Sequence, residues 1–260
     1  MFPVTWFDQF YTKYIREAGD PRTKGWFLVD SPLPALLINL VYYIFVTRLG
    51  PKLMKNRPAF NLRSLILTYN ALQVILNVGI LFWAETTPLR ENWFCMRVYT
   101  SDEVRNALMP PIGYAYYMMK FLDMADTIFF VLTKKQHFVT ALHLFHHTSM
   151  VGVSWFGVKY LPSGALAIAP YLNTWVHAIM YAYYFCTLYY GKLGLKWKKL
   201  MTSIQLVQFL LGTTLFIAHL LNPWCDFPKL IMIPVIMHGL TFIYMFGNFY
   251  YQNYVMPKKQ

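Results

Sequence analysis

Charged residues are scarce in this sequence. Only 13% of its 260 residues are Asp, Glu, Lys or Arg, whereas 57% are hydrophobic. An ordinary soluble domain carries about 25% charged residues, so the composition excludes that class and predicts a polytopic membrane protein. The N-terminal stretch also lacks a basic region followed by an apolar run. No cleaved signal peptide is therefore expected, and the first spanning segment is expected to direct the chain to the membrane.

Apolar runs of spanning length are what the sequence has instead. Seven of them approach the ~20 residues that a helix needs to cross a bilayer. They cover residues 32–49, 64–84, 111–132, 138–157, 164–190, 201–221 and 231–252. No internal repeat, low-complexity tract or linker interrupts them. The sequence therefore predicts an all-α polytopic membrane protein that forms one domain over residues 1–260. In it, a bundle of seven transmembrane helices (32–252) lies between an N-terminal segment (1–31) and a C-terminal tail (253–260).

Acidic residues are absent from one side of this predicted bundle. That side comprises the connections after the first, third and fifth segments and the C-terminal tail, with thirteen basic residues, whereas the opposite side holds nine basic and nine acidic ones. The thirteen are Arg48, Lys52, Lys55, Arg57, Arg63, Lys134, Lys135, Lys192, Lys196, Lys198, Lys199, Lys258 and Lys259. Because cytoplasmic loops are enriched in Lys and Arg, this side is expected in the cytosol and the N-terminus on the luminal side. Loop asymmetry then explains the net charge of +12, and no nucleic-acid partner is expected.

Cysteine is also rare, with three residues in the chain. Cys95 and Cys225 fall in connections on the predicted non-cytosolic side, where a disulfide can persist. Either they form a disulfide, or they are two free thiols that never meet. Cys186 lies within a spanning segment and is interpreted as a small apolar residue.

Ionisable residues occur inside the third segment, where they are energetically expensive and point to function. The stretch KFLDMADT places Lys120, Asp123 and either Asp126 or Thr127 at steps of three and four residues. This spacing puts them on one helical face, with Lys120 one turn from Asp123. The alternative interpretation is a structural ion pair or a helix–helix hydrogen bond that locks the bundle.

Three histidines cluster in the fourth segment. In LHLFHH, the spacing of His143, His146 and His147 places the three imidazoles on one face of a helix. By the predicted orientation they lie in the cytosolic half of the membrane. In the fifth segment, NTWVHAIMYAYY places Asn173 and His177 one helical turn apart.

The fifth and sixth segments carry further polar residues. Tyr181 extends the stripe of the fifth segment by one more turn, and packing is the alternative role for such a tyrosine. The sixth segment begins TSIQLVQ, with Thr202, Gln205 and Gln208 on one side. Hydrogen bonding between helices is the alternative role for these three.

Three kinds of chemistry are open to the imidazole cluster. Membrane di-iron enzymes use HxxHH boxes but need about eight imidazoles in several boxes, whereas this chain has seven histidines and one cluster, and it lacks HExxH. A transporter or receptor would use these groups as a proton relay or ligand site, but no transporter-like internal repeat is present. The third is catalysis by imidazole, with an acyl-imidazole as the acyl donor and an apolar channel that excludes water. The third is favoured, and no metal site is expected.

Four motifs in order resemble those of the very-long-chain fatty acid elongases, the ELO family. KFLDMADT resembles KxxExxDT, LHLFHH matches HxxHH, NTWVHAIMYAYY matches NxxxHxxMYxYY, and TSIQLVQ matches TxxQxxQ. The resemblance covers almost the whole chain, and DPRTKGWFLVDSPLP and GPKLMKNRPAF look like animal members. Asp123 departs from the family pattern, which usually has Glu there. The charge is kept, but the side chain is one methylene shorter.

The resemblance implies the condensing step of fatty acid elongation. In that reaction, acyl-CoA and malonyl-CoA give 3-oxoacyl-CoA, CO2 and free CoA, and no cofactor is expected besides these two substrates. It also implies a tunnel enclosed by the second to seventh segments, and residence in the endoplasmic reticulum membrane with a luminal N-terminus and a cytosolic C-terminus. The expected partners are membrane lipid and the 3-oxoacyl-CoA reductase, dehydratase and enoyl-CoA reductase of the cycle. A homodimer is a further expectation.

The resemblance and the chemistry together assign roles to individual residues. His146 is expected to attack the thioester, and His143 or His147 to orient it and handle the proton. His177 and Asn173 are expected to polarise the thioester carbonyl. The expected substrate-binding residues are Lys120, Asp123, Asp126, Tyr181, Gln205, Lys134 and Lys135. For the last two lysines, which are candidates for the CoA phosphates, a role in topology alone is the alternative.

Overall fold

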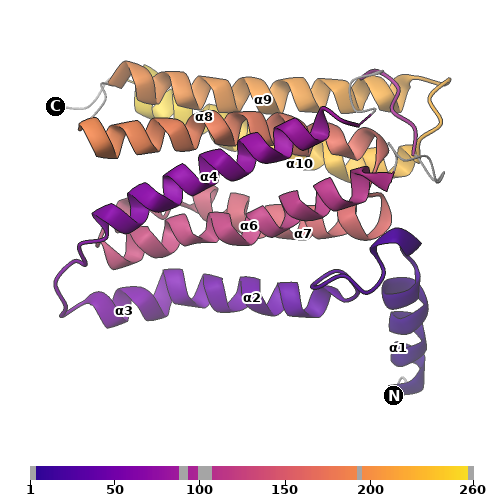
Figure 1. Cartoon of the computed structure of the whole chain (residues 1–260), viewed down its shortest axis with the longest axis horizontal. Coiled ribbons are helices and arrows are strands. Elements are labelled where there is room, and N and C mark those ends of the chain that lie inside the picture. Colours follow the sequence, from indigo (N-terminus) through magenta and orange to yellow (C-terminus); the bar gives the residue numbers. More distant parts are fainter. Residues whose placement is uncertain (1–3, 88–92, 99–106, 192–194, 257–260) are drawn as a thin grey trace. The chain divides into compact units, whose positions relative to one another are not determined.

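Every element in the described part of the chain is helical. The computed structural model describes residues 4–87, 93–98, 107–191 and 195–256 (Figure 1). The chain divides into two compact units, Met1–Asn61 with Asp102–Leu166 and Leu62–Ser101 with Ala167–Gln260. Each unit therefore combines two stretches that are far apart in the sequence.

The first unit is built around three long helical stretches. Its α-helices are α1 (Val4–Tyr11), α2 (Pro32–Ile44), α3 (Gly50–Met54), α6 (Met109–Leu132) and α7 (Ala141–Tyr160). Its shorter elements are the π-helical η1 (Thr12–Glu17) and η3 (Phe45–Leu49) and the 3-10 turns η2 (Pro21–Thr23) and η5 (Gln136–Phe138). The 3-10 turn η6 (Gly164–Ala167) contains the point at which the chain passes from the first unit to the second. Because η3 joins α2 to α3 without a break, Pro32–Met54 is one helical stretch of 23 residues.

The second unit consists of four long helices, namely α4 (Arg63–Ala84), α8 (Ile168–Tyr190), α9 (Leu195–Leu221) and α10 (Lys229–Tyr250). The π-helical η7 (Tyr251–Val255) extends α10. Within this unit, α4 packs along α8 and α9 packs along α10.

Helices occur at all seven predicted segments, with shifted ends. The fourth segment begins at Ala141 rather than 138, because Thr140 caps α7 by accepting a hydrogen bond at Oγ1 from the backbone N–H of His143 (3.2 Å). The sixth begins at Leu195 rather than 201, so Lys196, Lys198 and Lys199 lie in the first turns of α9 and not in a connection. Lysine is a good helix former, and no breaker stands between these lysines and the apolar run.

Four of the helical stretches in the described residues are long and apolar enough to cross a membrane. They are Pro32–Met54, Arg63–Ala84, Lys196–Leu221 and Lys229–Val255. Several such stretches in one chain are typical of a multi-pass membrane protein. The helices α6, α7 and α8 are 24, 20 and 23 residues long, but they carry the polar residues that drew attention in the sequence. The count of seven spans and the enclosed tunnel stay predictions.

Hydrogen bonds fasten the N-terminal segment of the first unit to α6 and α7. The backbone N–H of Asp20 donates to the carbonyl oxygen of Lys159 (2.8 Å). Nε1 of Trp155 donates to the carbonyl oxygen of Val29 (3.0 Å), and the hydroxyl of Tyr117 donates to that of Leu28 (3.1 Å). The first half of α6 and the last turns of α7 thus hold the loop that precedes α2.

A disulfide and a buried histidine close one end of the second unit. Cys95 and Cys225 form a disulfide with their Cα atoms 5.2 Å apart. Next to Cys95, the backbone N–H of Met96 donates to Nε2 of His219 (3.0 Å), and Nδ1 of His219 lies 2.8 Å from the carbonyl oxygen of Leu215. His219 therefore joins α9 to the connection that follows α4, as a hydrogen-bonded residue of the protein interior.

Candidate functional site

The three histidines of α7 form one continuous cluster of rings. The ring centroids of His143 and His147 are 4.3 Å apart, and those of His146 and His147 are 5.4 Å apart with the planes nearly perpendicular. His147 is buried, whereas His143 and His146 are partly exposed. His147 thus lies between the other two imidazoles, and its contact with His143 is the one expected from a four-residue step on one helical face.

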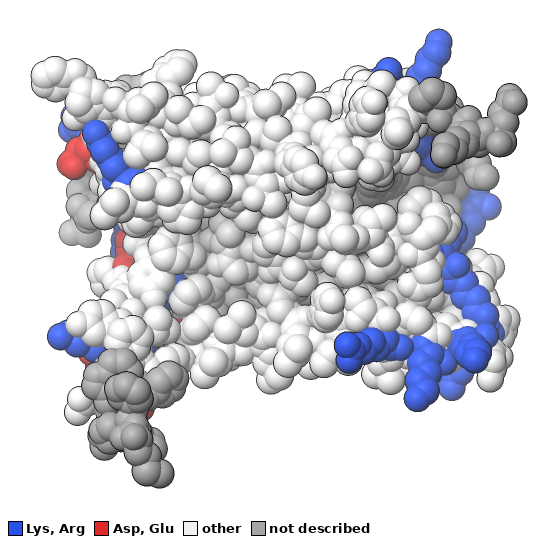
Figure 2. All heavy atoms as spheres, turned by 180° about the vertical axis from the view of Figure 1, so that it is seen from behind, with Lys and Arg blue, Asp and Glu red and all other residues white. Residues whose placement is uncertain are grey.

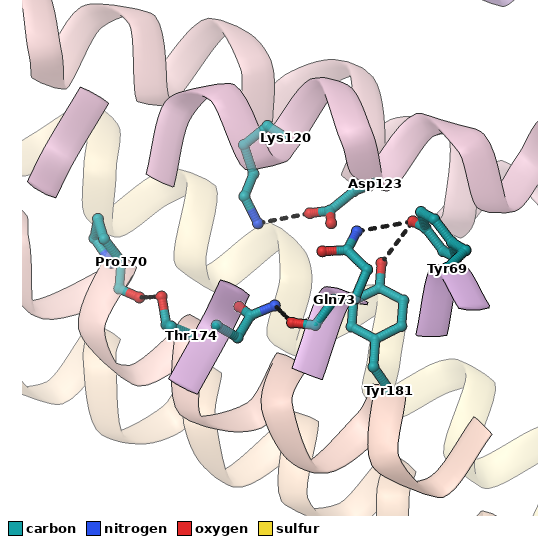
Figure 3. A network of polar contacts seen from close by, with 8 residues as sticks. Tyr69, Gln73, Lys120, Asp123, Pro170, Thr174 and Tyr181 are labelled. Carbon is teal, nitrogen blue, oxygen red and sulfur yellow. Dashed lines mark hydrogen bonds and ion pairs between the residues drawn. The ribbon is translucent and has the colours of Figure 1, made fainter. Parts of the chain in front are cut away.

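A buried ion pair lies on the neighbouring helix α6 of the same unit. Nζ of Lys120 lies 2.8 Å from Oδ2 of Asp123, one turn further on (Figure 3). The ammonium group of Lys120 also sits over the ring of Tyr116, 4.3 Å from its centroid. Although Asp123 has a shorter side chain than Glu, the i, i+3 geometry brings its carboxylate within reach of the lysine.

Thr127, rather than Asp126, continues the buried face of α6. Thr127 is fully buried and Asp126 only partly so. Oγ1 of Thr127 lies 2.7 Å from Nε2 of His143, so this threonine connects the polar face of α6 to the histidine cluster. The sequence left Asp126 and Thr127 as alternatives at this position, and the packing of α6 against α7 decides for Thr127.

Tyr42 is a site residue that the sequence analysis missed. Its hydroxyl lies 2.6 Å from Oγ1 of Thr127, and only 5% of Tyr42 is exposed. Tyr42 belongs to α2, the first predicted span, and is followed by Tyr43; tyrosines in an apolar span are ordinarily interpreted as packing or interfacial anchoring. No local signal in the sequence points from Tyr42 to a threonine that is 85 residues away.

The second unit holds its own buried polar stripe on α8. Asn173, His177 and Tyr181 are all buried, and the rings of His177 and Tyr181 lie 5.7 Å apart. The hydroxyl of Tyr181 lies 3.3 Å from that of Tyr69 on α4, and Nε2 of Gln73 donates to the hydroxyl of Tyr69 (2.8 Å), as Figure 3 shows. Of the predicted residues of the fifth segment, Tyr181 is thus part of a hydrogen-bonded network within this unit, and the ring of His177 packs against it.

The polar face of α4 was also missed in the sequence. Asn70, Gln73 and Asn77 are buried, and Nδ2 of Asn77 donates to the carbonyl oxygen of Gln73 (2.7 Å). Their spacing of three and four residues inside an apolar run is the same signal that singled out Lys120 and Asp123. The amides are uncharged and did not stand out, but they face the interior of the unit.

The remaining predicted residues lie toward the helix ends or on α9. Nε2 of Gln205 lies 3.4 Å from Sδ of Met180, so Gln205 reaches from α9 to α8 within the second unit. Lys134 and Lys135 are exposed in the connection between α6 and α7. In Figure 2 the Lys and Arg side chains gather at helix ends, and the helix sides are almost free of charge. Lys192, Lys258 and Lys259 lie outside the described residues.

Comparison with known proteins places the chain in a family. It matches the ELO family, described as the GNS1/SUR4 family, over residues 27–260. It is similar to very long chain fatty acid elongase 7 of Rattus norvegicus, at 40% identity over 96% of this chain and 91% of the relative. It is also similar to very long chain fatty acid elongase 1 of Homo sapiens, at 34% identity over 94% and 90% of the two chains. An elongase of Aedes aegypti is 37% identical over 95% of this chain and 70% of the relative. The chain belongs to the ELO (GNS1/SUR4) family.

Proposed function

We propose that this chain is the condensing enzyme of fatty acid elongation, a 3-oxoacyl-CoA synthase that joins an acyl-CoA to malonyl-CoA. Membership of the ELO family and the elongase names of its relatives support fatty acid elongation. The observation that carries the particular reaction is the cluster of three imidazoles on α7, held beside buried polar groups of α6. Such a cluster supplies a nucleophile together with groups that orient it.

The first half of the proposed reaction is acyl transfer to His146. An imidazole nitrogen attacks the thioester carbonyl, a C–N bond forms, and the C–S bond breaks. CoA leaves as a thiolate and is protonated to the thiol, and the proton lost from the imidazole is passed on within the histidine cluster. Partial exposure of His146 favours it over the buried His147 as the group that meets a substrate.

The second half transfers the acyl group to carbon. Malonyl-CoA loses CO2, and the electron pair of the broken C–C bond forms an enolate. The enolate carbon attacks the acyl carbon, the C–N bond to His146 breaks, and the imidazole is regenerated as 3-oxoacyl-CoA forms. Water has to be excluded during this sequence, because it would hydrolyse the acyl-imidazole.

The other predicted residues receive supporting roles in this proposal. His177 and Asn173 polarise the thioester carbonyl, as oxyanion donors do. The side chains of Lys120, Asp123 and Asp126 support the histidines or bind CoA, and those of Tyr181 and Gln205 line the acyl tunnel. The exposed lysines Lys134 and Lys135 and the lysines Lys196, Lys198 and Lys199 bind the CoA phosphates, with a purely topological role as the alternative.

We further propose the endoplasmic reticulum membrane as the site of action, with a luminal N-terminus and a cytosolic C-terminus. The disulfide between Cys95 and Cys225 supports this orientation, because disulfides persist in an oxidising compartment and both connections are expected on the luminal side. The product then passes to a 3-oxoacyl-CoA reductase, a dehydratase and an enoyl-CoA reductase, since two carbons are added but the 3-oxo group remains.

A direct assay tests the proposed reaction. Purified protein in detergent is given a panel of long-chain acyl-CoAs with labelled malonyl-CoA, without NADPH, and the products are analysed by mass spectrometry. We expect labelled 3-oxoacyl-CoA two carbons longer than the acyl-CoA supplied. Absence of product at every chain length, from protein shown to be folded, would refute the proposal.

A further inference from the structure

We infer that Tyr42 and Thr127 are positioning residues that hold His143 in one tautomer, with a hydrogen bond accepted at Nε2 and the proton on Nδ1. The inference rests on the proposed condensing reaction and deepens it, because it states which imidazole of HxxHH does not carry the acyl group. It concerns only residues of the first compact unit.

A short hydrogen-bonded chain connects three helices of that unit. The hydroxyl of Tyr42 on α2 lies 2.6 Å from Oγ1 of Thr127 on α6, which lies 2.7 Å from Nε2 of His143 on α7. Tyr42 is 5% exposed and Thr127 is fully buried. In the protein interior, a hydroxyl or N–H hydrogen without an acceptor costs free energy. We therefore assign the donor and acceptor in each of these two hydrogen bonds so that every such hydrogen has an acceptor.

The donor and acceptor in each of these hydrogen bonds follow from the number of hydrogens that the side chains can donate. Each hydroxyl has one hydrogen to donate. In the described part of the chain, Thr127 is the hydrogen-bond partner of the Tyr42 hydroxyl, and no second acceptor is present for it. Tyr42 therefore donates to Thr127, and Thr127 donates to Nε2 of His143. A neutral His143 that accepts at Nε2 carries its proton at Nδ1.

In this tautomer, His143 cannot act as the nucleophile. Its Nδ1 bears the hydrogen and the lone pair of Nε2 is occupied by Thr127, so neither nitrogen is available to attack a thioester. The ring of His147 packs on the ring held in this way and in turn contacts His146. Tyr42 and Thr127 thus position the ring on which His147 packs, and the partly exposed His146 remains as the imidazole that carries the acyl group.

Chemical labelling tests the hydrogen-bonded chain of Tyr42, Thr127 and His143 without relying on catalytic activity. Diethyl pyrocarbonate acylates an imidazole nitrogen with an available lone pair, and His143 and His146 are both partly exposed. Peptide mass spectrometry reports the labelling rate of His143, and one hydrogen bond corresponds to about a tenfold change in that rate. In Thr127→Val, His143 is expected to react about tenfold faster than in wild type. An unchanged labelling rate of His143 in Thr127→Val would overturn the inference.

Steady-state condensation assays separate positioning from packing. Thr127→Val, which keeps the shape of the side chain, is expected to lower kcat about tenfold or more while the KM for acyl-CoA stays within about twofold. Thr127→Ser keeps the hydroxyl and should retain a kcat close to wild type. Tyr42→Phe should cause a smaller loss, because Thr127 still donates to His143. Tyr43→Phe removes a hydroxyl from the exposed neighbour on α2 and is the matched control, with unchanged kcat.

The outcomes distinguish this inference from the proposed function. A folded wild-type protein that makes no 3-oxoacyl-CoA refutes the condensing reaction, while the labelling still decides the state of His143. Turnover by wild type with an equal kcat in Thr127→Val, or a Thr127→Ser variant as slow as Thr127→Val, refutes the positioning role. If Thr127→Val does not fold, Tyr42→Phe replaces it in the labelling of His143, because it retains the ring that fills the site. Its His143 should react faster than in wild type by less than tenfold, since Thr127 still donates but is no longer held by Tyr42, and an unchanged rate would overturn the inference.

Discussion

Removing one partner of the ion pair between Lys120 and Asp123 separates a structural role from a role in substrate binding. The two charged atoms are 2.8 Å apart, and each side chain is 3% exposed. At that distance and an effective dielectric constant of about 20, their attraction amounts to about 6 kcal/mol. Most of it offsets the hydration that both groups lose on burial. A partner left alone in the interior would retain that loss, so we expect Lys120→Met or Asp123→Leu to destabilise the protein by about 3–5 kcal/mol.

The double variant Lys120→Met with Asp123→Leu is the informative comparison. It removes both charges and fills the space with apolar atoms, a replacement that is often neutral or stabilising. Thermal unfolding followed by size-exclusion chromatography in detergent should show a Tm lowered by about 6–20 °C in each single variant. The double variant should recover most of that difference. Asp123→Glu keeps the charge and should remain close to wild type.

Condensation activity measured on the same samples assigns the role. If the pair is only structural, activity should return in the double variant together with Tm. If Lys120 or Asp123 binds substrate, Tm should return while activity stays lost. Single variants with a wild-type Tm, or losses that add in the double variant, would refute the reasoning, because either result means that the charges are not coupled across 2.8 Å.

Three other perturbations have outcomes that follow from the site and the fold. His146→Ala should abolish 3-oxoacyl-CoA formation while leaving Tm unchanged, and near-normal product would show that His146 is not the nucleophile. A metal chelator should leave condensation unaffected in the same mass-spectrometric assay, and strong inhibition reversed by added iron would favour di-iron chemistry. His219→Ala should lower stability by about 1–3 kcal/mol, because the backbone N–H of Met96 loses its acceptor inside the protein. The exposed His137→Ala serves as its control in thermal unfolding, and equal Tm values for the two variants would contradict the structural role of His219.

The helices and the periodicity of their polar residues could be predicted because both are local properties of the chain. The lengths of the apolar runs placed all seven long helices, and errors of a few residues arose where capping or a preceding 3-10 turn sets the start, as at Ala141 and Ile168. The spacing of three and four residues correctly predicted the pairing of Lys120 with Asp123. Both partners belong to one helix, so no knowledge of packing was needed.

The tertiary structure decided which polar groups meet across helices. The residues Tyr42, Thr127 and His143 come from three helices, and they touch only because of how each helix is rotated and packed within the first unit. The same rotation buries Thr127 and leaves Asp126 partly exposed, a choice that the spacing left open. Of the two alternatives for Cys95 and Cys225, which are 130 residues apart, the structure has the disulfide. The positions of the helices and the residues that share a face follow from the amino-acid sequence, since periodicity is local. Contacts between distant segments depend on the packing of the whole unit, and only the folded chain provides them.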